Sequence, residues 1–407
     1  MNAVGIDVSK GKSMVSVLRP FGEMVISPFE VKHNQNELNE LVKCLKSLNG
    51  ETKVIMECTA NYHLPISYHL QKSGFIVCAV HAKLIHNFDN NSIRKVKTDK
   101  ADSLKIANYG LSRWLQLSEY VPNENTRHML KAYSHQYNKY IKLRTSLKNN
   151  LISLLDQTFP NANEIFTSPP RSDNGHEKWI DLVGNYWHFQ CVSLVSLNEF
   201  SERYRKWCKR FGYYFQQSKV ESIYSEAMGH IGIMPKNNVT KLLIRQAVAQ
   251  INSICENLAV IKREMIRLAQ TLPEYSAVIT FNGVGELLAS QLMAEIGDIY
   301  RFHTKKSLVS FAGLDAPPYA SGKFVSSKRH ISKKGSPHLR KSLFQVMDGI
   351  LKRSPEGDPI YQFIDRKRAE GKPYLLYMTA GSAKFLRIYY ARVKELLDTH
   401  CSKHNLP

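Results

Sequence analysis

The chain has 407 residues, of which 43% are hydrophobic and 22% charged, and it carries a formal net charge of +21. This length exceeds one ordinary core, so we expect two or three domains in a globular chain. We find no bilayer-spanning apolar run and no signal peptide, and therefore expect a cytoplasmic protein with no membrane partner. Seven scattered cysteines without paired spacing indicate reduced thiols, which excludes a disulfide frame or a zinc site. The excess of Lys and Arg favours a polyanionic partner over a role in solubility alone.

The first 124 residues have the pattern of an α/β domain. We expect strands at 3–9, 13–19, 23–31, 53–57 and 75–80, and helices at 35–48 and 62–72. Turn residues at 20–22 can join two of the early strands as a hairpin. Three hairpin-linked strands followed by alternating helix and strand are the order of a ribonuclease-H-like fold.

Four acidic residues are spread through this domain. Asp7 lies in the strand segment GIDVSK, Glu57 ends the strand at 53–57, and Asp99 and Asp102 open a helix on one of its faces. In the expected fold, the two strand residues meet at one edge of the sheet and the helix closes the site. A basic protein has little use for converging carboxylates unless cations cancel their repulsion, and hard divalent cations take such oxygen ligands. We therefore predict a nuclease-type site for Mg²⁺ (or Mn²⁺).

The middle region, 125–271, is expected to be helical. Apolar residues recur at three- and four-residue steps over 125–158, and a second long helix carries about three heptads between Ile244 and Leu268. These patterns predict coiled-coil helices that pair either within one chain or between chains. The segment at about 160–238 has no clear period and is interpreted as an inserted small helical module of open role.

The third domain, 272–407, opens with a helix-hairpin-helix pattern around Gly283 and Gly285. These glycines allow a tight turn in which backbone N–H groups can approach a phosphate. A plain helical bend without a ligand is the alternative.

A basic stretch follows, and it contains no Asp or Glu between residues 323 and 341. Ser321 stands beside Gly322 at its start, which is a suitable place to meet a scissile phosphate, although Ser326, Ser327 and Ser332 compete for that role. A solvated loop is the alternative, but the apolar helix that follows indicates a folded element. The cations expected to contact phosphates are Lys323, Lys328, Arg329, Lys333, Lys334 and Arg340.

Together these segments resemble the DEDD-type insertion-sequence transposases, which are related to the Piv pilin-gene invertase. The resemblance is carried by GIDVSK, MECT and KTDKADSLKIA near the N-terminus, and by GVG, AGL and ISKKGSPHLRKSL near the C-terminus. It implies a RuvC-like nuclease domain, a coiled coil and a serine-bearing transposase domain. The family's tetrad then corresponds to Asp7, Glu57, Asp99 and Asp102, and its serine nucleophile to Ser321.

The resemblance also implies an activity and partners. The expected function is excision and insertion of a mobile element through metal-assisted serine attack on DNA, guided by a structured RNA that the element encodes. We expect a homodimer that assembles to a tetramer, associated with a prokaryotic nucleoid. Two alternatives stay open: a RuvC-like junction resolvase that uses metal-activated water, in which Ser321 is structural, and a non-catalytic nucleic-acid-binding protein.

Overall fold

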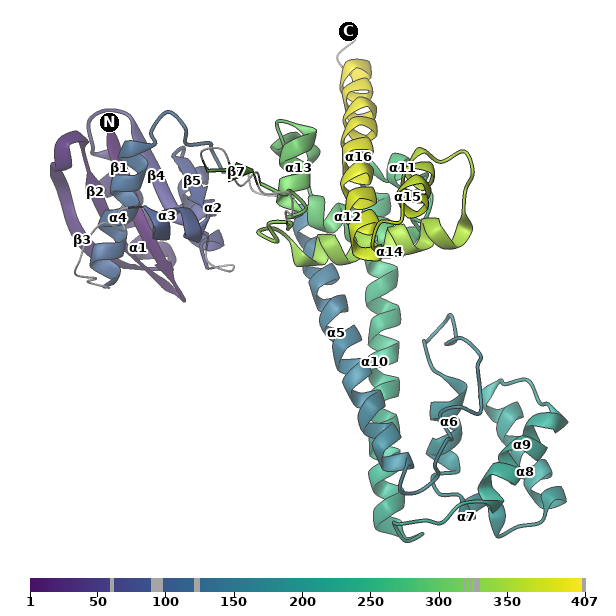
Figure 1. The fold of residues 1–407 in the computed structure, drawn as a ribbon. Coiled ribbons are helices and arrows are strands. Elements are labelled where there is room, and N and C mark those ends of the chain that lie inside the picture. The colour runs from purple at the N-terminus through teal and green to yellow at the C-terminus, as the bar shows by residue number, and fades with distance from the viewer. Residues whose placement is uncertain are drawn as a thin grey trace. The chain divides into compact units, whose positions relative to one another are not determined.

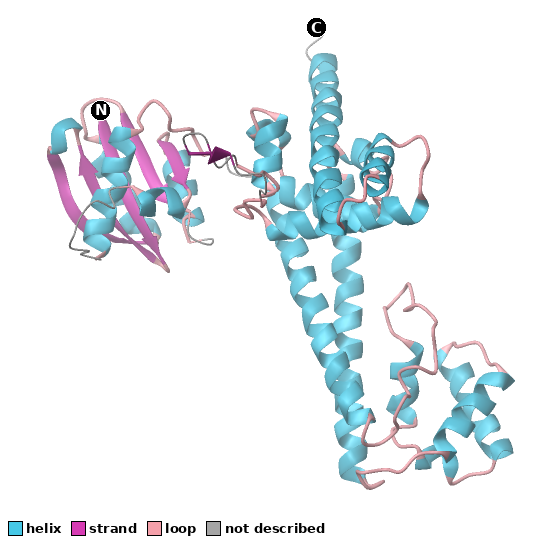
Figure 2. Cartoon of the chain, viewed as in Figure 1, coloured by secondary structure: helices cyan, strands magenta, loops and turns pink. Residues whose placement is uncertain are grey.

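A computed structural model describes residues 1–58, 62–88, 98–120, 125–317, 320–321, 324–325 and 330–404. The chain separates into two compact units, Met1–Pro122 and Asn123–Pro407 (Figure 1). The first is built on a mixed five-stranded sheet, and the second is mainly helical (Figure 2). Both features confirm the expected fold class at this level. None of the described helices is both long and apolar enough to cross a membrane.

The sheet of the first unit has the strand order β3-β2-β1-β4-β5. The three N-terminal strands form an antiparallel meander, β4 pairs parallel to β1, and β5 pairs parallel to β4. This is the connectivity that we expected of a ribonuclease-H-like domain. In chain order the strands are β1 (Asn2–Ser9), β2 (Lys12–Leu18), β3 (Met24–Lys32), β4 (Thr52–Glu57) and β5 (Ile76–Val80).

Helices cover both faces of this sheet, because alternate side chains along each strand point to opposite faces. Val4, Ile6 and Met56 share one core with apolar residues of α1 and α2, whereas Ala3 and Ile55 share the other with α4. The helices of this unit are η1 (Pro20–Gly22), α1 (Gln35–Lys46), α2 (Leu64–Lys72), α3 (Ala82–Asn87) and α4 (Asp99–Ser112).

Two long helices dominate the second unit, α5 (Asn125–Leu155) and α10 (Asn238–Gln270). They lie side by side in Figure 1 and run antiparallel, since Leu130 shares a core with Met265 and Leu151 shares another with Ile251. The structure therefore pairs these helices within one chain. Their predicted coiled-coil packing stays a prediction.

A helical module lies between the two long helices in sequence. Its apolar side chains, among them Trp179, Phe200 and Tyr204, form a core with the ends of α5 and α10 that are distant from Leu130. The module contains α6 (Lys178–Asn185), α7 (Gln190–Ser193), α8 (Leu197–Phe211) and α9 (Gln217–Met228).

The C-terminal part packs around the other ends of α5 and α10. Its core contains residues of α12, α14 and α16, and the buried Arg127 side chain of α5 pairs with Glu274 just before α11. In chain order the elements are α11 (Tyr275–Val278), α12 (Glu286–Ile296), η2 (Ile299–Arg301), α13 (Lys305–Phe311), β6 (Ala320–Ser321), β7 (Phe324–Val325), α14 (Pro337–Arg353), α15 (Pro359–Ala369) and α16 (Tyr374–His404).

Candidate active site

Asp7 and Glu57 lie next to each other across two parallel strands. The register of β1 and β4 pairs Gly5 with Ile55 and Ile6 with Met56, and each acidic residue is the next one along its strand. Both side chains are half-buried. Because side chains alternate between faces, Asp7 shares the face of Gly5, and Glu57 shares the face of Ile55. That is the face covered by α4.

The helix α4 crosses this face in the direction opposite to β1. A Cβ atom placed on Gly5 would lie 2.1 Å from the Ser103 carbonyl oxygen, and one placed on Gly110 would lie 2.5 Å from Ile55 Cδ1. One helical turn before Ser103 lies about 5.4 Å back along α4. The step from Gly5 to Asp7 along β1 is of similar length, roughly 6.6 Å, and runs in the same direction in space. The first turn of α4 therefore lies at the level of Asp7.

That first turn carries the other two acidic residues. Thr98 caps the helix, with its Oγ1 accepting from the Ala101 amide at 3.2 Å. Asp99 is exposed and Asp102 is half-buried. The positive end of the helix dipole stabilises carboxylates at this position. Lys12 donates to Glu30 at 2.7 Å, and this hydrogen bond, the charge of Glu30 and that of Asp99 raise the pKa of Lys12.

The four carboxylates offer only oxygen ligands, which is the donor chemistry that hard divalent cations prefer. Throughout the described part of the chain, however, no three His, Cys, Asp or Glu side chains form a group able to hold a metal ion. The structure brings the predicted residues to one end of the sheet without closing them around an ion. Their role as metal ligands stays a prediction.

In the second unit, Ser321 lies in a segment whose two ends, 311–315 and 332–336, are joined by backbone hydrogen bonds. The Ser332 amide donates to the Asp315 carbonyl at 2.7 Å, the Lys333 amide to the Gly313 carbonyl at 3.1 Å, and the Ser336 amide to the Phe311 carbonyl at 3.0 Å. Between these ends, Ser321 pairs with Phe324 in the short β6–β7 ladder. The chain therefore presents Ser321 on a hairpin whose base is fixed to the helical core.

The other predicted residues of this stretch have different contacts and exposure. Ser332, a competitor for the nucleophile, donates its hydroxyl hydrogen to Asp315 Oδ1 at 2.6 Å. Lys333 and Lys334 are exposed, and Lys333 has a left-handed backbone with φ of 52°. Arg340 is half-buried and donates to the carbonyls of Ala312 and Gly335 at 2.9 and 3.2 Å, so it supports the base of the hairpin. The predicted residues outside the described part are Lys323, Lys328, Arg329, Ser326 and Ser327.

Sequence reasoning missed a buried anchor beneath this hairpin. Glu295 of α12 is 3% exposed and accepts hydrogen bonds from Ser336 Oγ at 2.7 Å and from His135 Nε2 at 2.8 Å. Burial by itself disfavours the charged carboxylate, but the hydrogen bonds from His135 and Ser336 hold the pKa of Glu295 below its usual value. The available signal was a glutamate between Ala294 and Ile296, near the end of a helix that is largely apolar.

The two glycines of the predicted helix-hairpin-helix have different environments. Gly283 has φ of 76°, and a Cβ there would lie 2.6 Å from the Val346 carbonyl oxygen of α14, so packing alone explains this glycine. Gly285 precedes α12 and has open space around it. The helix before the turn, α11, is only four residues long. Phosphate binding at this turn stays a prediction.

Two family models match the chain, one at each end. A model of DEDD transposases of the IS110 type, described as a transposase, matches residues 4–160, and a model described as the transposase IS116/IS110/IS902 family matches residues 275–362. Both models describe one family, and together they cover more than half of the chain. The chain belongs to the IS110 family of transposases. It is therefore a DNA transposase or recombinase, and neither of these two models covers residues 161–274.

Relatives of known description agree with this family. The transposase is 20% identical over 398 residues to an insertion element IS110 protein of Streptomyces coelicolor, covering 96% of this chain and 94% of that one. It is 28% identical over 120 residues to the pilin gene-inverting protein of Moraxella bovis, and equally so to that of Moraxella lacunata. These matches cover 30% of this chain and 37% of each inverting protein.

Among solved structures, Thermus RuvC in complex with a Holliday junction substrate (T. thermophilus) aligns with 30% of the transposase and 99% of RuvC. The sequence identity is 12% and the TM-score is 0.23. A TM-score of this size does not establish a common fold, so the fold of the first unit rests on its strand order.

Proposed function

We propose that this transposase excises and inserts its insertion sequence through a covalent intermediate on Ser321. The observation that carries the proposal is the hairpin base, where three backbone hydrogen bonds join 311–315 to 332–336, while Ser321 pairs with Phe324 in the ladder between them. Lys333 and Lys334 are exposed at this base and can bind phosphates of the DNA. A nucleophile needs such a fixed support, because a misplacement of about 1 Å costs roughly 100-fold in rate.

The chemical step is a transesterification. Ser321 Oγ attacks the phosphorus, a bond forms between them, and the bond to one sugar oxygen breaks, with the serine proton passing to the leaving hydroxyl. A free hydroxyl of the partner strand then reverses the step, so the phosphodiester energy is kept. A serine hydroxyl is a weak nucleophile and needs activation. Asp7, Glu57, Asp99 and Asp102 would hold a divalent cation, Mg²⁺ or Mn²⁺, which supplies charge stabilisation at the phosphate.

The proposal extends to the partners. The tetrad and Ser321 belong to different compact units of the chain. We propose that the transposase forms a homodimer that assembles to a tetramer. The net charge of +21 supports binding of a structured guide RNA together with DNA. Light scattering with and without element-end DNA measures the assembly. Sequencing of the RNA that co-purifies with the chain identifies the guide.

Replacement of the nucleophile tests the mechanism. Ser321→Ala removes one oxygen and should abolish both the covalent protein–DNA adduct and the recombined product, while nucleic-acid binding persists. Ser326→Ala and Ser327→Ala are matched controls and should remain active. Ser332→Ala removes the hydrogen bond to Asp315 and should lower activity without removing the adduct. If Ser321→Ala still nicks DNA, water is the nucleophile, and the resolvase-type mechanism replaces the covalent one.

A further inference from the structure

The helical module has a pocket of its own on one side of α6. Its volume is about 380 Å³, within the usual range of ligand sites. The floor is the buried ring of Phe166, and Arg171, Lys178 and Lys219 stand half-buried at its walls. This pocket lies in residues 161–274, which neither of the matching family models covers.

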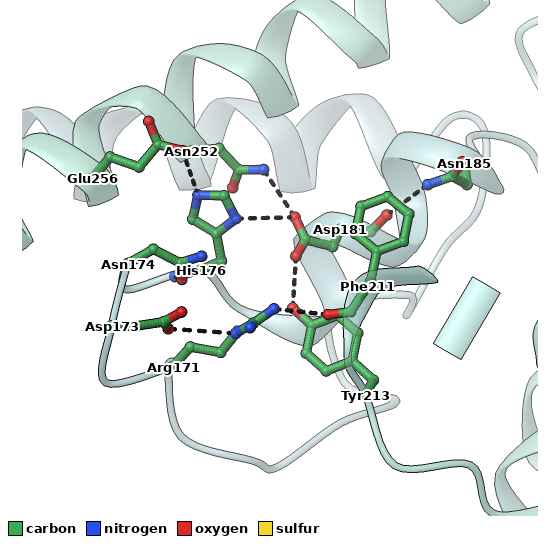
Figure 3. Close-up of polar contacts among 10 residues, drawn as sticks. All are labelled: Arg171, Asp173, Asn174, His176, Asp181, Asn185, Phe211, Tyr213, Asn252 and Glu256. Atoms are coloured by element: carbon green, nitrogen blue, oxygen red, sulfur yellow. Dashed lines mark hydrogen bonds and ion pairs between the residues drawn. The ribbon is translucent and has the colours of Figure 1, made fainter. Parts of the chain in front are cut away.

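The charge of this pocket selects an anion. Its lining includes Arg171, His176, Lys178 and Lys219 and no Asp or Glu. Arg171 and His176 already have carboxylate partners, Asp173 at 3.4 Å from Arg171 and Glu256 at 3.1 Å from His176 (Figure 3). Within the described residues Lys178 and Lys219 form no ion pair, so these two lysines supply the charge for an anion. The Lys178 and Lys219 ammonium groups lie 4.7 and 5.7 Å from the centre of the Phe166 ring. Burial lowers the pKa of Lys178, and the nearby Lys219 charge lowers it further. A bound anion would offset the repulsion between the Lys178 and Lys219 charges.

The two lysines retain donors for such a ligand. Lys178 Nζ donates to the Tyr214 carbonyl at 3.1 Å, and Lys219 Nζ donates to the Ile165 carbonyl at 2.7 Å. An ammonium group has three N–H donors, and within the described residues each lysine uses one of them in a hydrogen bond. Both side chains are therefore held in place by the backbone while they keep donors for a phosphate.

A buried polar network fixes the walls of the pocket (Figure 3). Asp181 is 4% exposed and accepts hydrogen bonds from Tyr213 Oη at 2.6 Å and from Asn252 Nδ2 at 2.8 Å. Arg171 donates to the Phe211 carbonyl at 2.8 Å, and its guanidinium lies 5.4 Å from the centre of the Tyr213 ring. Binding would therefore not have to order these two side chains, which lowers the entropy cost of recognition.

An aromatic ring stands at the mouth of the pocket. Tyr214 is 79% exposed, and its backbone carbonyl accepts the hydrogen bond from Lys178 Nζ. Thr167, Ser168 and Gln216 are exposed around the same mouth and offer hydrogen-bonding groups. An exposed aromatic ring and cations that line one pocket are the combination with which proteins bind single-stranded nucleic acid, since the ring stacks on a base and the cations bind its phosphate.

We propose that this pocket binds one unpaired nucleotide of a nucleic-acid strand, with its phosphate at Lys178 and Lys219 and its base stacked on Tyr214. Arg171 would provide a second contact to the phosphate. The inference rests on the proposed function only in that the partner is a nucleic acid, and it is independent of the chemistry at Ser321. The nucleotide can come from a DNA strand, an RNA strand or the free pool, and the experiment separates these sources.

The test uses the full chain and short fluorescent strands of oligothymidine and oligouridine, a duplex of equal length, and free uridine monophosphate as competitor. We expect Tyr214→Ala and Lys219→Gln each to weaken binding of a single strand by roughly tenfold. Tyr214→Phe keeps the ring and should bind like the wild type. Lys236→Gln is the matched control, because Lys236 is an exposed lysine of the same module that donates to the Gln190 carbonyl at 3.2 Å.

Photo-crosslinking with thiothymidine or thiouridine locates the contact. We expect crosslinks in the peptide that contains Tyr214, formed by whichever strand is the natural source, and competition by the free monophosphate alone would identify the free pool. Unchanged single-strand binding in both Tyr214→Ala and Lys219→Gln would overturn the proposal, and so would an equal loss of duplex binding. Strand cleavage by the wild type is measured in a separate assay. Loss of the pocket proposal would therefore not contradict the proposed function, and loss of the Ser321 mechanism would not contradict the pocket proposal.

Discussion

The close contact between α4 and β1 predicts that a side chain at Gly5 destabilises the protein. An alanine Cβ at this position would lie 2.1 Å from the Ser103 carbonyl oxygen and 2.4 Å from the Ala107 amide nitrogen. Both are backbone atoms of a helix, so neither can turn aside. To reach ordinary contact at 3.4 Å, the helix must move away by about 1.3 Å. Overpacking of this kind costs about 1–3 kcal/mol, and we expect Gly5→Ala at the upper end.

The same displacement should impair catalysis. Asp99 and Asp102 lie on the first turn of α4, so moving the helix separates them from Asp7 on β1. A misplacement of about 1 Å can lower the rate roughly 100-fold, and we expect Gly5→Ala to lose DNA strand cleavage by about that factor. Nucleic-acid binding should change little, because the substitution leaves the lysines and arginines of the chain unaltered.

Two other glycines provide graded controls. At Gly110 the added Cβ would lie 2.5 Å from Cδ1 and 2.7 Å from Cγ1 of Ile55, which are side-chain atoms and can give way where backbone atoms cannot. Gly110→Ala should therefore cost less than Gly5→Ala, with part of the cost offset by the higher helix propensity of alanine. A Cβ on Gly357 meets nothing within 4 Å, so Gly357→Ala should be neutral.

Hydrogen exchange followed by mass spectrometry measures the perturbation at its source. The peptides of α4 and β1 should exchange faster in Gly5→Ala, whereas those of α5 and α10 should be unaffected. Cleavage of element-end DNA, measured together with any RNA that co-purifies, gives the activity. Wild-type exchange in α4 together with wild-type cleavage would refute the close approach of α4 to β1 and the reasoning built on it.

Three further predictions follow from other parts of the transposase. Asp102→Asn removes the charge of a proposed metal ligand at constant size, so metal-dependent cleavage should fall by orders of magnitude while binding in a gel-shift assay persists. Near-normal recombination would remove Asp102 from the proposed site. Lys333→Gln combined with Lys334→Gln should lower the log–log salt slope of DNA binding by roughly two, and an unchanged slope would place both residues on a solvated face. Glu295→Gln should destabilise the chain by about 1–3 kcal/mol at neutral pH. The folded-state pKa of Glu295 lies below its usual 4.5, so this stability is present above pH 4.5 and is lost as the pH falls through the folded pKa. Denaturation of wild type and variant should therefore converge in acid, and a constant difference would contradict the anchor.

The sheet of the first unit was predictable because its strands are short, apolar and rich in β-branched residues. Each expected strand lies within one residue of the observed one at both ends. The neighbourhood of Asp7 and Glu57 follows from the same pattern, since parallel strands end at the same edge of a sheet. The position of Asp99 and Asp102 at a helix start was also predictable, because Thr98 supplies a cap.

Other features were decided only by contacts between segments that are distant in the sequence. Periodicity marked α5 and α10 as long helices, yet it could not choose their partners, and the tertiary structure pairs them within the chain. The pattern around Gly283 predicts a phosphate turn, and that stays a prediction; only the tertiary structure shows that the backbone of α14 leaves no room for a side chain at Gly283. Glu295 gave no sequence signal of its partners, because His135 and Ser336 reach it from positions 160 residues before it and 41 residues after it. Local propensity determines which segments become strands and helices, but the approach of two backbones and the burial of a charge depend on which segments meet, and that is set by the packing of the whole chain.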